Sequence, residues 1–188
     1  MRIGLFLIFL CLFAIVLQLG VFPALIPHLL QPDIGILLAI PVLAFATREH
    51  GLIAVFALGV QADLFGSARF GLLTLCYMLA AGLILWLAWR ELTRGDLLAP
   101  WLGSVAATCL AHLLYVLVGR ICGLQVPIGT ALVNIGSLTV AAVVWGLFFA
   151  WFCGKCMNTL GLLSPAVRER WSVDERIASA RRGKVMRA

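Results

Sequence analysis

Six runs of apolar residues, separated by short stretches rich in charge, proline or glycine, take up most of this 188-residue chain. They cover residues 3–22, 34–46, 51–62, 70–89, 97–118 and 128–152, and the third can extend through Leu64 and Phe65. A helix needs about 20 apolar residues to cross a hydrocarbon core about 30 Å thick. The first, fourth, fifth and sixth runs reach that length, whereas the second and third are shorter. The pattern predicts an all-α polytopic membrane protein with six transmembrane helices.

Composition excludes a soluble domain of this size. The chain is 63% hydrophobic and only 12% charged, with a mean hydropathy of +1.10, whereas soluble domains average about 45–50% apolar and about 25% charged residues. The apolar runs nearly exhaust the chain, so we expect no large extramembrane enzyme domain. We divide the chain into a transmembrane domain at 1–156 and a basic cytoplasmic juxtamembrane tail at 157–188.

The second and third runs admit two arrangements, because only residues 47–50 separate them. They form either two short spans or one re-entrant hairpin. A hairpin would place Arg48 and Glu49 at membrane depth, where an ionised side chain costs at least ~2.5–3.5 kcal/mol. We therefore favour two short, tilted spans, with Pro41 kinking the first of them.

Loop charges predict the orientation, because lysine and arginine gather in cytoplasmic loops. With both termini inside, twelve of the fourteen basic residues are cytoplasmic and only Arg69 and Arg120 lie outside. The first run is expected to stay as a helix, since no small-residue cleavage site follows it. Topology also explains the net charge of +6, so we expect no nucleic-acid partner.

The tail contains its own helix signal. Ser164 followed by Pro165 is typical of an N-cap and first helical position, and Val167, Trp171 and Ile177 fall on one side of the helix that would follow. An interfacial helix of this kind would bind anionic lipids or an acidic partner. A solvated tail that only fixes topology is the equal alternative.

Two cysteines give the chain its one redox motif. Cys153 and Cys156 have the C-x-x-C spacing, which suggests a quinone-linked thiol oxidase. That reaction needs a second pair facing the oxidising side, where only Cys122 lies. Metal binding would need two further ligands, and His50 is the one obvious cytoplasmic candidate. No nucleotide or hydrolase motif occurs, so we expect a non-enzyme without a cofactor.

Polar residues inside the apolar runs are rare and mark pairs, contacts or pathways. They are Gln18, Gln61, Asp63, His112 and Asn134. We expect Asp63 to pair with Arg69 at the outer interface or to cap the next turn. His112 and Asn134 are expected to bond to each other between helices, in preference to a proton relay.

Small residues at every fourth position predict close helix packing. They occur as Gly103, Ala107 and Ala111 in the fifth run and as Ala142, Gly146 and Ala150 in the sixth. The two helices are expected to pack on each other or on a partner.

A stretch between the first and fifth runs carries a family resemblance. It holds Pro32-Asp33 before an apolar run, a basic break at Arg48, the segment 59–72 with Asp63 and Gly71, and then Tyr77. This resembles the rod-shape-determining MreD family of bacterial inner-membrane proteins. Two departures are Gly66-Ser67, where the family more often has Ser-Gly, and Gln61, in a usually apolar stretch.

The resemblance implies a non-enzymatic component of the bacterial cell-elongation complex in the inner membrane. Its implied partners are an MreC-like membrane protein and, indirectly, the MreB cytoskeleton and the peptidoglycan synthases. The structural or partner-binding candidates are Asp33, Asp63, Arg69, Gly71, His112 and Asn134. Asp33, Asp63 and Arg69 are expected to be the sensitive outer-face residues.

A rival function comes from a second likeness, because the family is similar in fold to the substrate-binding subunits of energy-coupling-factor vitamin transporters. A small-molecule binding subunit of an importer needs a pocket open to the outside and lined by polar or aromatic groups. We expect few polar residues for such a pocket in this chain.

Overall fold

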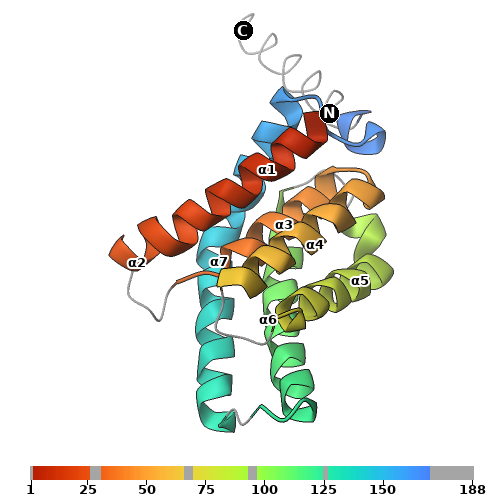
Figure 1. Cartoon of the computed structure of the whole chain (residues 1–188). Coiled ribbons are helices and arrows are strands. Elements are labelled where there is room, and N and C mark those ends of the chain that lie inside the picture. Colours follow the sequence, from red (N-terminus) through yellow and green to blue (C-terminus); the bar gives the residue numbers. More distant parts are fainter. Residues whose placement is uncertain (1, 26–30, 66–69, 93–96, 125–126, 170–188) are drawn as a thin grey trace, which may run out of the picture.

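The computed structural model of the chain describes residues 2–25, 31–65, 70–92, 97–124 and 127–169. In these ranges the regular secondary structure is helical throughout (Figure 1). The elements are α1 (Arg2–Ile15), the π-helix η1 (Val16–Val21), α2 (Phe22–Leu25), α3 (Ile34–Phe45), α4 (Arg48–Phe65), α5 (Leu72–Leu92), α6 (Leu98–Ile121) and α7 (Ile128–Thr159). The all-α prediction is confirmed.

Helix α3, which corresponds to the second predicted span, forms the centre of the bundle. All twelve of its residues are buried, and it packs mainly on α4, α6 and α7. A helix that is apolar on every side needs such a surrounding. Pro41 lies inside α3, and the helix continues from Ile34 to Phe45 through it.

Length separates the helices into two groups. Among the described residues, three helices are long and apolar enough to cross a membrane: Ile3–Leu25, Leu98–Ile121 and Ile128–Thr159. The apolar helices Ile34–Phe45 and Leu72–Leu87 are shorter. Helix α5 as a whole runs from Leu72 to Leu92, which is 21 residues, so the expectation that the fourth run spans unaided stays a prediction. Six crossings stay a prediction, because at about 1.5 Å per residue α3 is only about 18 Å long.

The third predicted segment starts earlier than expected and ends at Phe65, as its possible extension predicted, and the sixth ends later than expected. Helix α4 begins at Arg48 and ends at Phe65, and α7 continues to Thr159. Gly161, with φ +67°, follows the end of α7, and the N–H of Leu162 donates to the carbonyl of Met157 over 2.8 Å. This is the Schellman arrangement that terminates helices at a glycine.

The N-terminal arm, which consists of α1, η1 and α2, packs on α4 and α3 through α1 and meets α7 through aromatic rings. Phe13 stacks on Phe152 at 5.0 Å between ring centroids, and Phe22 meets Trp145 edge-on at 5.1 Å. Within the arm, the N–H of Phe22 donates to the carbonyl of Leu17, which is the i to i+5 bond of a π-helix.

Helices α6 and α7 run side by side (Figure 1). All six small residues of the predicted packing motif are buried. A Cβ atom added to Gly146 would lie 2.9 Å from Cδ1 of Trp101, and the Trp101 indole donates to the carbonyl of Val143 over 3.0 Å. The prediction that these helices pack on each other is confirmed.

The first part of the predicted tail folds back onto α3. The N–H of Ser164 donates to the carbonyl of Phe45 over 2.8 Å, and a helical turn begins at Pro165, as predicted. Leu163 and Val167 are buried in the core. Trp171 and Ile177 lie outside the described residues.

Candidate functional site

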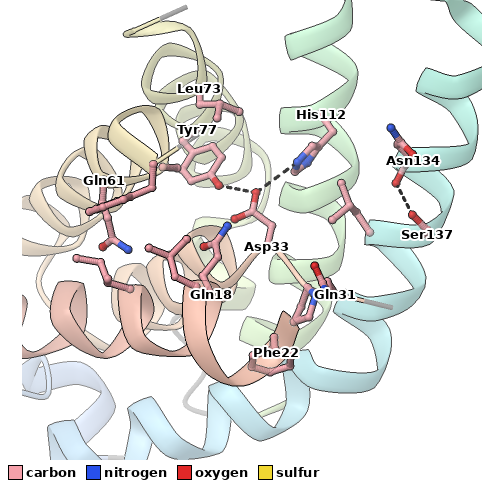
Figure 2. A pocket seen from close by; sticks show the side chains of 16 residues that line it. Gln18, Phe22, Gln31, Asp33, Gln61, Leu73, Tyr77, His112, Asn134 and Ser137 are labelled. Carbon is pink, nitrogen blue, oxygen red and sulfur yellow. Dashed lines mark hydrogen bonds and ion pairs between the residues drawn. The ribbon is translucent and has the colours of Figure 1, made fainter. Parts of the chain in front are cut away.

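Asp33 is the residue around which the site is built. It is the N-cap residue of α3, yet its side chain makes no capping hydrogen bond. Its Oδ2 atom instead accepts a hydrogen bond from the Tyr77 hydroxyl at 2.5 Å and lies 3.3 Å from Nε2 of His112 (Figure 2). The carboxylate therefore joins α3 to α5 and α6.

A glycine makes the contact between Asp33 and Tyr77 close. A Cβ atom added to Gly35 would lie 3.3 Å from the Tyr77 hydroxyl and 3.4 Å from Oδ1 of Asp33. Tyr77 itself is 1% exposed. A buried tyrosine hydroxyl needs a hydrogen-bond partner, and here the partner is a carboxylate from another helix.

The hydrogen bonds of His112 fix one proton on its ring. Nδ1 lies 2.9 Å from the carbonyl oxygen of Thr108. A carbonyl can only accept, so Nδ1 carries the proton of this bond. Nε2 is left to face Oδ2 of Asp33. A carboxylate oxygen can also only accept, so Asp33 holds the other side of the imidazole when Nε2 carries a proton as well.

Asp63 forms a separate unit at the start of α5. Its Oδ1 accepts the N–H of Leu73, and its Oδ2 accepts the N–H and the hydroxyl of Thr74, at 2.9, 2.9 and 2.5 Å. The first amides of a helix have no partner within it, so this carboxylate from α4 caps α5. The predicted capping role is confirmed, and Gly71 makes the turn with φ +91°.

A pocket of about 360 Å³ lies beside the Asp33 cluster. Its wall collects polar side chains from helices that are far apart in the sequence, namely Gln18, Gln31, Asp33, Gln61, Tyr77, His112, Asn134 and Ser137. Apolar residues of η1, α4, α5 and α7 complete it. The expectation of few polar residues for a pocket is wrong, because tertiary packing gathers the scattered ones at one end of the bundle.

Two buried acceptors at this pocket have no hydrogen-bond partner. They are Oδ1 of Asp33 and Oε1 of Gln61, and both residues are 8% exposed. In Figure 2 the carboxylate of Asp33 and the amides of Gln18 and Gln61 point into the same space. Buried polar atoms are almost always paired, so each of these two atoms needs a donor that the described residues do not supply.

The other predicted site residues are His112, Asn134 and Arg69. The bond between His112 and Asn134 is absent, because both ring nitrogens of His112 already face other groups. Asn134 lines the pocket and is exposed. Arg69 lies outside the described residues. The predicted pair of Asp63 and Arg69 therefore stays a prediction, while both oxygens of Asp63 accept hydrogen bonds from α5.

Tyr77 and Ser137 were not predicted as site residues. Tyr77 belongs to the segment that carries the family resemblance, and a tyrosine inside an apolar run was a usable signal for a buried hydroxyl that needs a partner. Ser137 gives no such signal, because its hydroxyl bonds to the Asn134 carbonyl of its own helix over 2.9 Å.

None of the described residues that line the pocket is a cysteine. All six are in the described part of the chain and none forms a disulfide. Cys153 and Cys156 are both within α7, and Cys153 is 0% exposed. Among the described residues, no three His, Cys, Asp or Glu side chains are grouped so that they could hold a metal ion.

Comparisons of the chain with protein-family models, with curated proteins and with solved structures found no match. The family resemblance therefore rests on the residues of the chain itself.

Proposed function

We propose that this membrane protein is a non-enzymatic component of the bacterial cell-elongation complex. In this role it sits in the inner membrane with both termini in the cytoplasm and binds an MreC-like membrane protein. Through that partner it acts with the MreB cytoskeleton and the peptidoglycan synthases to support lateral wall growth and rod shape.

The observation that carries the proposal is the structural role of the resemblance residues. Asp33 and Tyr77 bond to each other across 44 residues of sequence, Asp63 caps α5, and Gly71 has a backbone conformation that favours glycine. These residues join α3, α4 and α5 into one unit. A motif whose members bond to one another and so hold three helices together suits an adaptor.

Exposed apolar faces on α1 and α7 suit binding to other membrane helices. On α1 they consist of Leu5, Ile8, Phe9 and Leu12, and on α7 of Val140, Val144, Leu147 and Trp151, each between 45% and 62% exposed. Such a surface contacts lipid or a partner helix. We assign the MreC-like partner to this surface and anionic lipids to the basic tail.

Depletion of the protein in its native bacterium tests this function. Cell width is followed by microscopy, and partners are recovered from the membrane after crosslinking. Rounded cells together with recovery of an MreC-like protein are the expected result. Cells of normal shape, with no component of the elongation complex recovered, would contradict the proposal.

One observation favours the rival function, a small-molecule binding subunit of an importer. The pocket of about 360 Å³ falls within the range of about 300–1,000 Å³ that is usual for small-molecule sites. The crosslinking experiment separates the two functions. Recovery of a transporter ATPase assembly, with normal cell shape after depletion, would support the importer.

A further inference from the structure

We propose that the pocket beside Asp33 binds the primary ammonium group of an amphiphilic ligand. The site requires neither a role in cell elongation nor a role in import. It follows from the acceptors that the fold leaves open, from the charges around them and from the way the pocket meets the lipid-facing surface.

The first step concerns the missing donors. Oδ1 of Asp33 and Oε1 of Gln61 are buried and lack partners, and both residues belong to the wall of one pocket. A carboxylate oxygen can only accept a hydrogen bond. The ligand group at this position must therefore donate hydrogen bonds, and an ammonium group carries up to three donors.

The second step concerns charge. The described residues that line the pocket include the carboxylate of Asp33 and the imidazole of His112, which faces that carboxylate, and no lysine or arginine. His112 and Tyr77 both face the other oxygen of that carboxylate, Oδ2, so neither supplies a donor to Oδ1. An anionic oxygen placed at Oδ1 of Asp33 would meet another acceptor. This position in the pocket therefore suits a cationic donor.

The third step concerns access. Leu19 and Phe65 line the pocket and are each 52% exposed. Exposed apolar side chains of a membrane protein face acyl chains, so the pocket opens where a lipid tail can lie. Leu19 and Gln18 both belong to the π-helix η1, and π-helical segments occur frequently at functional sites. The pocket therefore fits a ligand that has an ammonium group at one end and an apolar chain at the other.

Two sources offer this chemistry, namely a phospholipid with an ethanolamine headgroup and a free aliphatic amine. The full-length protein is placed in nanodiscs containing equal amounts of phosphatidylethanolamine, phosphatidylcholine and phosphatidylglycerol with matched acyl chains. Native mass spectrometry then measures which lipid stays bound. Phosphatidylcholine is the matched control, because its headgroup is cationic but has no N–H donor.

Retention of phosphatidylethanolamine at least tenfold above the other two lipids is the expected result. Equal retention of the three lipids, combined with saturable binding of radiolabelled ethanolamine, would assign the site to a free amine. Equal retention without ethanolamine binding would overturn the proposal and leave the two acceptors to water.

Two variants connect the result to the pocket. Asp33→Asn removes the charge and should abolish the preference. It also disturbs the contacts with Tyr77 and His112, so Gln61→Met is the second variant, because Oε1 of Gln61 has no hydrogen-bond partner in the fold. We expect Gln61→Met to lower the preference at least threefold. Asn158→Met, on the exposed end of α7, is the matched control and should change nothing. An unchanged preference in Gln61→Met and Asp33→Asn would contradict the site.

Discussion

At the residue scale, two carboxylates of the same chain have different surroundings. Asp63 uses both oxygens to accept hydrogen bonds from the start of α5. Asp33 uses one oxygen to join Tyr77 and His112 and leaves the other without a donor. The first arrangement is complete within the fold, and the second is not. We therefore assign stability to Asp63 and ligand binding to Asp33.

The variant Asp63→Asn tests the capping role. An asparagine keeps one acceptor and turns an NH₂ group toward a donor of α5, so we expect the free energy of unfolding to fall by about 1–3 kcal/mol. Thermal unfolding of the purified protein in detergent measures the change. Thr74→Ser keeps the hydroxyl and serves as the control. If Asp63→Asn also co-purifies normally with an MreC-like partner, the charge serves only as a local cap.

At the scale of single elements, the bundle depends on glycines that let helices approach closely. A Cβ atom added to Gly51 of α4 would lie 2.6 Å from the Cα atom of Leu43 in α3, and one added to Gly59 would lie 2.9 Å from the Cα atom of Thr74 in α5. Both neighbours are backbone atoms, so the helices themselves must separate. The short, buried α3 is held by this close packing more than by its own length.

The variant Gly51→Ala should therefore destabilise the protein, by about 1–3 kcal/mol, as overpacked cores do. Gly82→Ala in α5 is the matched control, because nothing lies within 4 Å of its added Cβ atom. The control should be neutral or should gain up to about 1 kcal/mol from helix propensity. Chemical denaturation in mild detergent measures both, and equal stability of the two variants would contradict the packing argument.

At the scale of the whole molecule, the pocket residues come from the helix ends that loop charges place outside. Gln18 is near the end of the first predicted span, Gln61 is near the end of the third, and Asn134 is near the start of the sixth. With both termini in the cytoplasm, all three lie toward the outer side. The orientation thus decides whether the pocket lies on the outer or the cytoplasmic side of the membrane, and in which lipid leaflet.

Cysteine labelling tests this orientation. Cys122 is the one exposed cysteine, whereas the other five are buried or partly buried. It follows α6, at an end predicted to lie outside. A membrane-impermeant maleimide should label right-side-out vesicles of the wild type, and Cys122→Ser vesicles should stay unlabelled. Labelling confined to inside-out vesicles would reverse the topology and move the pocket to the cytoplasmic side.

Most helices were predictable, because an apolar run bounded by polar residues is a local property of the chain. The Asp63 cap was also predictable, since its partners Leu73 and Thr74 are only 10 and 11 residues away. The lengths of the helices were less predictable. Lys155 and Asn158 are polar and follow the predicted end of the sixth run, yet both lie within α7, because a helix can carry polar residues on a face that meets water.

The sequence by itself determined an all-helical membrane protein, because a water-soluble fold of 188 residues cannot bury this much apolar surface. Only the tertiary structure decided the site. The bond between Tyr77 and Asp33 crosses 44 positions, and the partner of a buried polar group depends on which helices pack together. That choice is made by glycine contacts and side-chain fit in three dimensions, which the spacing of residues along the chain does not contain.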